Sequence, residues 1–429
     1  MFGFANFLLL ALSAAAVFDL IFALARGGGL RGALHGLWNT PHLLLGQQLA
    51  EWRLQLGRIL FAAGLAAYEI SVVFCNSMAR QNWAWVQGVM SPVLEWLAFL
   101  CFGAKILFGT RYTWRELLAG GALYFIARWV YFNSQNIWWI GIVVAVLAAK
   151  DVPLRRPLQV YFASGCAAMA VVLALHFAGI VAPDLTSERM GALRGTYGYG
   201  HPNTFGGLVF GLVLAYALLR AQKVRWVDCL LVFAVGVFLL VGPASRSAAL
   251  CTLALAVGLV FCRLRAGHSV PRWWPGTCAG MVGLTAAVSY LLPLLVIKVG
   301  PWNNDIGPAW LAKLDSLLTC RISLTWMAYR LLDVKIAGQV FNWPTVDNSF
   351  AFALFQFGPV VAALLGILFA AALWGHAKQG RRVEVCCLFA MLAYAYMEVQ
   401  PFHLTTNPTA LLLCGAVFAQ TSARWQKIE

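Results

Sequence analysis

Long apolar runs recur throughout this chain, and they restrict the folds it can adopt more than any other feature. About 20 apolar residues cross a bilayer as a helix, because a helix satisfies its own backbone hydrogen bonds in lipid. Only 11% of the residues are charged, against about 25% in a soluble domain, and the mean hydropathy is +0.76. Thirteen runs fit this description: 4–25, 58–76, 90–108, 115–132, 135–149, 157–181, 203–220, 226–243, 246–263, 276–298, 349–374, 383–399 and 407–422.

These runs predict an all-α, polytopic integral membrane protein with about 12–13 transmembrane helices in a single membrane domain, residues 1–429. The fifth run is short, and twelve spans are expected if it is re-entrant. No basic residue precedes the first run, so we expect an uncleaved helix and not a signal peptide. Most of the eleven cysteines lie in or beside apolar runs, where cysteine acts as a small hydrophobe, so we expect neither disulfides nor a metal site.

The net charge of +15 is distributed in a way that predicts the orientation of the helices. Alternate connections between the runs hold about two-thirds of the 31 Lys and Arg residues, and such residues favour the cytoplasmic side of a membrane. The N-terminus is therefore predicted outside and the C-terminus in the cytoplasm. Because topology explains the positive charge, nucleic-acid binding loses its support.

The longest connection, residues 299–348, is predicted on the outer side, and a long loop on a compact scaffold is often functional. Apolar residues at helical spacing predict an amphipathic helix over about 309–336. Arg321 lies on or beside its apolar face, and Arg330 is the next candidate cation. An anionic ligand would explain Arg321, and so would a rim position against lipid phosphates.

A glycine-rich turn before the seventh run has the features of an anion site. Its glycines permit close backbone approach, and Pro202 suits a first helical turn. The N-terminus of the following helix faces outward, and its free N–H groups attract phosphates. Arg194, His201 and Asn203 are therefore candidate site residues, although the same segment would also serve simply to begin a helix.

A tight outer hairpin between the eighth and ninth runs carries Ser245 and Arg246. Ser245 is suited to cap the ninth helix. Arg246 then lies at membrane depth or just above it, where an ionisable residue is costly and indicates a function. The alternative is that Arg246 extends to the lipid headgroups.

Carboxylates and histidines complete the polar residues of the outer side. Asp347 precedes the eleventh run as a natural N-cap, a role that would lower its pKa and make it a poor base. Glu398 and His403 lie near the outer end of the twelfth run. Cations, outward helix N-termini and carboxylates together suit an anionic headgroup, most simply that of a phosphorylated lipid. The sequence has no P-loop and no cluster at metal-ligand spacing, so no nucleotide, metal or other cofactor is expected.

The order of these motifs resembles the O-antigen ligase and polymerase superfamily, and it is most similar to the capsular and exopolysaccharide repeat-unit polymerases of Gram-positive bacteria. The resemblance covers about residues 190–415, whereas the first 190 residues are similar only in hydropathy. It rests on Gly198–Gly206, Ser245–Ser247, Leu317–Leu324 around Arg321, Val346–Phe350 with Gly358, and Tyr396–Glu398 with Asn407–Pro408.

The resemblance implies a GT-C-like fold in the bacterial plasma or inner membrane. It implies metal-independent, inverting transfer of glycan repeat units from a polyprenyl-diphosphate-linked oligosaccharide on the extracytoplasmic face. A flippase and a chain-length regulator are the expected partners besides membrane lipid.

The resemblance also implies roles for the candidate residues. The family's ligases place His where this chain has Asp347, which leaves the general base open and favours a polymerase over a ligase. The implied base is one of four residues: Asp347, His201, Glu398 or His403. The implied diphosphate ligands are Arg194, Arg246 and Arg321, with Arg330 as a further cation, and Asn203 and Asn348 are implied as other substrate contacts.

Three other functions stay open. One is ligation of a finished glycan to another acceptor. A second is a flippase or transporter of lipid-linked oligosaccharide, which should carry polar residues along a path through the membrane. The third is a structural membrane subunit, which would tolerate alanine in place of the outer arginines.

Overall fold

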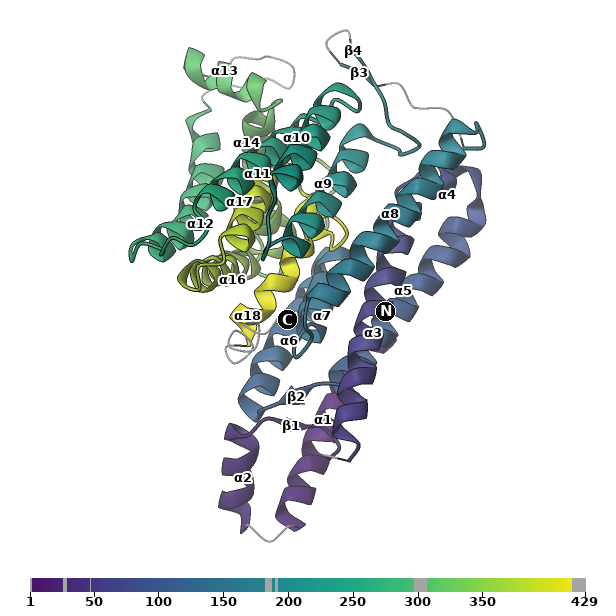
Figure 1. The fold of residues 1–429 in the computed structure, drawn as a ribbon, viewed down its shortest axis with the longest axis vertical. Helices are drawn as coiled ribbons and strands as arrows, with labels where there is room; N and C mark the ends of the chain where they lie inside the picture. The colour runs from purple at the N-terminus through teal and green to yellow at the C-terminus, as the bar shows by residue number, and fades with distance from the viewer. Residues whose placement is uncertain are drawn as a thin grey trace.

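The computed structural model describes residues 2–25, 29–46, 48–181, 187–189, 192–296 and 307–418, and these residues are mostly helical (Figure 1). The end of the tenth predicted run and the start of the predicted loop, residues 297–306, lie outside the described residues. So do residues 419–422 of the thirteenth run.

The N-terminal half is a set of helices in which α3 packs on both α5 and α8. A two-stranded pair, β1 (His42–Leu43) with β2 (Arg111–Tyr112), joins two of its connections. The helices are α1 (Phe2–Ala25), α2 (Gly29–Asn39), α3 (Ala50–Cys75), α4 (Ala79–Asn82), the π-helical turn η1 (Val86–Met90), α5 (Ser91–Phe108), α6 (Trp114–Ser134), α7 (Ile137–Ala148) and α8 (Arg155–Phe177).

The C-terminal half begins with a hairpin, β3 (Ser187–Arg189) and β4 (Ala192–Arg194). Its helices are α9 (Pro202–Leu219), α10 (Trp226–Val241), α11 (Arg246–Leu264), α12 (Trp274–Leu291), η2 (Leu292–Leu295), α13 (Ala309–Leu317), α14 (Arg321–Leu331), α15 (Ser349–Phe352), η3 (Ala353–Phe357), α16 (Pro359–Lys378), α17 (Arg382–Met397), η4 (Gln400–Phe402), η5 (Pro408–Leu413) and α18 (Cys414–Val417). In Figure 1, α13 and the β3–β4 hairpin lie at the top, and α2 lies at the bottom with the β1–β2 pair.

The helices agree with an all-α, multi-pass membrane protein. Within the described residues, eight helices are long and apolar enough to cross a membrane. The other five predicted runs are helical as well, but they are shorter or more polar. They correspond to α6, α7, α10, α17, and η5 with α18.

The eleventh predicted run, 349–374, is not one helix. It is interrupted at Gly358, whose φ of +87° is a conformation that favours glycine. A Cβ at Gly358 would overlap the carbonyl of Ile336, and one at Gly338 would overlap the carbonyl of Gln356. The end of the long loop therefore packs directly on the bend between η3 and α16, which fixes the start of α16.

The single amphipathic helix expected over 309–336 is also wrong, because the chain forms α13 and α14 with a break between them. Thr319 and Cys320 have φ values of 58° and 66°. Buried Asp315 explains the break, since its carboxylate accepts hydrogen bonds from the backbone N–H groups of Ile322 (2.7 Å) and Ser323 (3.1 Å). These are free donors of the first turn of α14, and Arg321 becomes the first residue of that helix.

Helix α9 is the most buried of the candidate spans, and its glycines allow close packing. A Cβ at Gly206 would overlap Ser245, and one at Gly207 would overlap Gln400. One at Gly211 would lie 2.6 Å from the carbonyl oxygen of Thr405. The segment 398–407 after α17 is thus held against α9, which places Glu398 beside the first turn of α9.

Candidate functional site

Glu398 is the centre of a polar cluster that draws on distant parts of the chain. It follows the last residue of α17 and is only 6% exposed. Its Oε1 accepts hydrogen bonds from Asn203 Nδ2 (3.0 Å), Ser247 Oγ (2.5 Å) and Arg321 NH2 (2.7 Å). Oε2 accepts none from the residues that the structure describes. We call these residues, with Arg194, the Glu398 cluster.

Arg321 forms a buried ion pair with Glu398, at 2.7 Å and with 8% of Arg321 exposed. Its Nε donates to the carbonyl of Met397, and its NH1 donates to the carbonyl of Leu318 and to the hydroxyl of Thr319. Four of the five donors of this guanidinium are therefore engaged inside the protein. The break before α14 makes this possible, because it turns Arg321 toward the end of α17.

Arg194 lies on the other side of Glu398, joined to it through Asn203. Its NH2 donates to Asn203 Oδ1 (2.9 Å) and to the carbonyl of Ala244 (3.3 Å). The amide of Asn203 accepts from Arg194 and donates to Glu398, so it bridges a cation and an anion. Strand β4 ends at Arg194 and α9 begins one residue before Asn203, which sets this arrangement.

Arg246 differs from the two buried arginines. It is the first residue of α11 and is exposed. Ser247 contacts Glu398, and the hydroxyl of Ser245 lies 3.5 Å from Asn203 Oδ1, so Arg246 stands beside the cluster. It has no hydrogen bond or ion pair within the described part of the chain, and its guanidinium is open to a ligand.

Arg330, predicted as a further diphosphate ligand, is not joined to the cluster by any contact among the described residues. It lies at the exposed C-terminal end of α14, where it stacks on Trp326 with its guanidinium carbon 5.8 Å from the ring centroid. Arg330 lies nine residues after Arg321, which corresponds to about 13 Å along a helix. Arg330 therefore contacts a residue of its own helix, Trp326, and lies away from the Glu398 cluster.

The segment before α15 corrects one expectation. Asn348, and not Asp347, is the N-cap, because its Oδ1 accepts from the N–H groups of Phe350 (2.9 Å) and Ala351 (3.1 Å). Its Nδ2 donates to Ser289 Oγ (3.0 Å), so both the oxygen and the nitrogen of this amide already have partners within the protein. Asp347 is half-buried and accepts no hydrogen bond from the described residues. The next polar side chain, Ser349, donates to the backbone carbonyl of Glu398.

Burial and the charge of Arg321 act in opposite directions on the pKa of the Glu398 carboxyl. Burial raises the pKa of the Glu398 carboxyl above its ordinary value, and the nearby charge of Asp347 adds to the rise. The positive charge of Arg321 and the hydrogen bond from Ser247 act in the opposite direction. The net result is a pKa above the ordinary value of a glutamate side chain.

The two candidate histidines lie at the edge of this arrangement. His201 is the exposed N-cap of α9, and its Nδ1 accepts from the N–H of Asn203 (3.1 Å). His403 packs on Trp138 with ring centroids 3.7 Å apart. Burial lowers the pKa of His403 to about 3, which makes its imidazole a weak base.

Sequence reasoning predicted most of the Glu398 cluster but missed Ser247 as a member, and it missed Ser349 as a donor to the backbone of Glu398. Both serines lie within the motifs Ser245–Ser247 and Val346–Phe350, and that position was the available signal. In the part of the chain that the structure describes, no group of three or more His, Cys, Asp and Glu residues could hold a metal ion. No protein-family model, no curated protein and no solved structure matches this chain.

Proposed function

We propose that this protein is a membrane glycosyltransferase that polymerises a polysaccharide from repeat units carried on a polyprenyl diphosphate. One observation carries the proposal. Segments far apart in the sequence bring Asn203, Ser247 and Arg321 onto one buried carboxylate, Glu398, and Arg194 joins them through Asn203. These segments are the ones whose motifs resemble the O-antigen ligase and polymerase superfamily.

Arg246 is the best candidate for direct contact with the donor diphosphate. It is exposed at the cluster and has no protein partner among the described residues. A guanidinium binds phosphate oxygens through two parallel hydrogen bonds. Arg194 and Arg321 are largely engaged within the protein, so they would act through their positive charge and by holding Glu398 in place.

The chemistry is a single displacement. The acceptor hydroxyl attacks the anomeric carbon of the donor sugar, and the new C–O bond forms as the bond from that carbon to the diphosphate oxygen breaks. Polyprenyl diphosphate leaves with the electron pair, and positioned cations stabilise the charge that builds on it. Attack from the face opposite the leaving group inverts the anomeric centre, and a carboxylate takes the proton of the hydroxyl.

Asp347 is the carboxylate that we assign to this proton. It is half-buried and accepts no hydrogen bond from the described residues, whereas Glu398 Oε1 has three donors. Hydrogen bonds to a carboxylate stabilise its charged form and weaken it as a base.

A flippase is less well supported by the packing around α9. A second polar region does lie at the other end of this helix, near Arg220. From Asn203 to Arg220, however, the chain is about 26 Å of apolar and glycine-rich helix. At Gly211 the neighbouring backbone lies so near that a Cβ would be 2.6 Å from a carbonyl oxygen. The described residues thus form no polar path along α9.

The proposal is tested with Arg246→Ala in a deletion strain, with Arg330→Ala as the matched control. Both arginines are exposed, but only Arg246 stands at the cluster. Lipid-linked glycans and surface polysaccharide are compared on gels after membrane insertion and abundance are shown to be equal. We expect Arg246→Ala to lose polymer and to accumulate single lipid-linked units outside the cell, while Arg330→Ala makes normal polymer.

Other outcomes point elsewhere. Finished chains that remain on the lipid carrier would indicate a ligase. Units that accumulate only on the cytoplasmic side would indicate a flippase. Normal polymer in the Arg246→Ala strain would refute the assigned diphosphate contact.

A further inference from the structure

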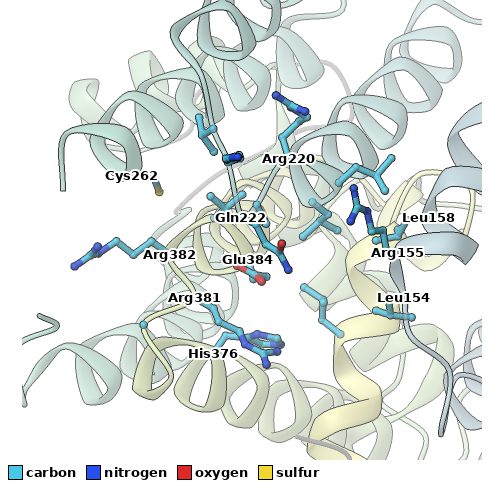
Figure 2. Close-up of a pocket in the computed structure, with 18 of the residues that line it drawn as sticks. Leu154, Arg155, Leu158, Arg220, Gln222, Cys262, His376, Arg381, Arg382 and Glu384 are labelled. Carbon is cyan, nitrogen blue, oxygen red and sulfur yellow. The ribbon is translucent and has the colours of Figure 1, made fainter. Parts of the chain in front are cut away.

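A cavity lies at the end of α9 opposite to the Glu398 cluster, on the face that the charge bias predicts to be cytoplasmic. Its volume is about 860 Å³, which suits a ligand of headgroup size. It is bordered by the first residues of α8 and α17 and by the last residues of α9, α11 and α16 (Figure 2). We call it the basic cavity.

Basic side chains from four separate connections meet at this cavity. Arg155, Lys223, Arg263 and Arg381 line it, and none has a hydrogen bond or ion pair within the described residues. Glu384 is the only carboxylate among the lining residues. In Figure 2, Arg155 and Arg381 approach the open space from different sides, with Glu384 between them.

Two further arginines at the cavity are already engaged and serve as a comparison. Arg220 Nε lies 3.2 Å from both carboxylate oxygens of Asp228. Arg382 donates to the backbone carbonyls of Arg265 and His268, and in Figure 2 its side chain points away from the others. The protein therefore provides hydrogen-bond partners for Arg220 and Arg382. Among the described residues it provides none for the four basic side chains named above.

The cavity wall contains a buried polar atom without a partner and two helix N-termini. Nδ1 of His376, a residue that is 8% exposed, has no hydrogen-bond partner in the described structure. Helices α8 and α17 begin at the cavity, and neither has a side-chain cap on its free N–H groups. Such N–H groups and the helix dipole attract anions.

The simplest alternative is that these cations only set topology, because Lys and Arg gather on the cytoplasmic side of any polytopic protein. That rule explains their side of the membrane but not their convergence on one cavity. Arg156 and Lys378 are exposed cations next to the same helix ends, and they do not line the cavity. These two residues show that the positive-inside bias places cations on this side of the membrane without directing them into the cavity.

We infer that the basic cavity is a second anion site that binds a phosphate- or diphosphate-bearing group. The wall formed by Leu154, Leu158 and Leu412 is apolar, so the cavity combines a cationic part with a surface for the start of an acyl or isoprenoid chain. Basic pockets between transmembrane helices on the cytoplasmic side bind the headgroups of anionic lipids. The same cations would also bind a free diphosphate. This inference does not depend on the proposed function, because binding is measured without glycan transfer.

The test compares two double variants of the full-length protein. Arg155→Gln with Arg381→Gln removes two cavity cations, and Arg156→Gln with Lys378→Gln removes two neighbouring charges outside it. Cardiolipin binding is measured by native mass spectrometry on protein from phosphatidylcholine nanodiscs with and without cardiolipin. Binding of inorganic diphosphate is measured by calorimetry in detergent.

The cavity variant should bind weaker than the control by roughly thirtyfold, since each removed cation is worth about a fivefold change in affinity. Loss for cardiolipin alone identifies a lipid headgroup as the ligand, and loss for diphosphate as well identifies a free anion. Binding at the Glu398 cluster contributes equally to both variants. Equal binding by the two variants, or no binding of either probe to the wild type, would overturn the inference. Should the first variant fold poorly, Lys223→Gln with Arg263→Gln removes two exposed cavity cations instead.

Discussion

The ion pair between Arg321 and Glu398 gives an asymmetric prediction, because only one of its members can lose its charge easily. In Glu398→Gln, Arg321 stays cationic and buried without a counter-ion at every accessible pH. Loss of one partner of a buried pair costs about 3–5 kcal/mol. Arg321 keeps acceptors at Met397, Leu318 and Thr319, so we expect a cost near 3 kcal/mol for this variant.

In Arg321→Gln, by contrast, Glu398 can take up a proton. Burial already raises the pKa of Glu398, and removal of Arg321 takes away the charge that opposes the rise. A group with a raised folded-state pKa gives stability that is present at low pH and is lost as pH rises through that pKa. Each pH unit over which only the folded state holds the proton is worth about 1.4 kcal/mol. Lowering the pH from about 7 to about 5 should therefore stabilise Arg321→Gln relative to Glu398→Gln by up to about 2.7 kcal/mol.

Unfolding of the two variants in detergent, followed at both pH values, measures this difference. The double variant with both changes should be more stable than Glu398→Gln alone, because it leaves no unpaired buried charge. Neither it nor the single variants should make polymer. Parallel pH dependence in the two single variants would refute the reasoning, since Glu398 would then not be the group that takes up the proton.

Three further predictions follow from the same structure. Arg246→Ala should leave the melting temperature unchanged while polymer is lost, because the side chain is exposed; a lowered melting temperature would show that it supports the fold. Gly358→Ala should cost at least about 2 kcal/mol in unfolding free energy, whereas Gly366→Ala in α16, with open space at its Cβ, should be neutral or stabilise by up to about 1 kcal/mol. Asp315→Ala should cost about 1–2 kcal/mol and reduce polymer, because α14 loses its N-terminal hydrogen bonds and Arg321 its position; unchanged unfolding would contradict this.

The sequence predicted the helices well because hydropathy is a strong signal over 20 residues. Most of each of the thirteen apolar runs is helical where it is described, although the eleventh is interrupted at Gly358. The same signal hid two interruptions. The apolar pattern continues through Thr319 and Cys320, and it continues through Gly358, so periodicity alone predicts unbroken helices there. Only the buried charge of Asp315 and the single glycine mark the breaks.

Most members of the Glu398 cluster were predicted from the sequence, but their contacts with one another were not. Asp347 and Asn348 are both good N-cap residues, and a shift of one residue in the helix start decides between them. The partners of the arginines were hidden for another reason. Arg321 and Arg194 donate to backbone carbonyls at Met397, Leu318 and Ala244, and backbone acceptors leave no trace in a sequence pattern.

The hydrogen bonds distinguish arginines and carboxylates that the sequence pattern could not tell apart. Arg194 and Arg321 flank Glu398, and together these three groups carry one net positive charge in a nearly dry environment. An anion that binds at Arg246 adjacent to them would meet a positive field that is already oriented, so little rearrangement would be needed as charge builds on a leaving group. Oε1 of Glu398 already accepts three hydrogen bonds that stabilise its charged form, which makes it a weaker proton acceptor. Asp347, which has no donor among the described residues, is then the carboxylate better suited to take the proton of the acceptor hydroxyl. Glu398 is better suited to hold the arginines in position.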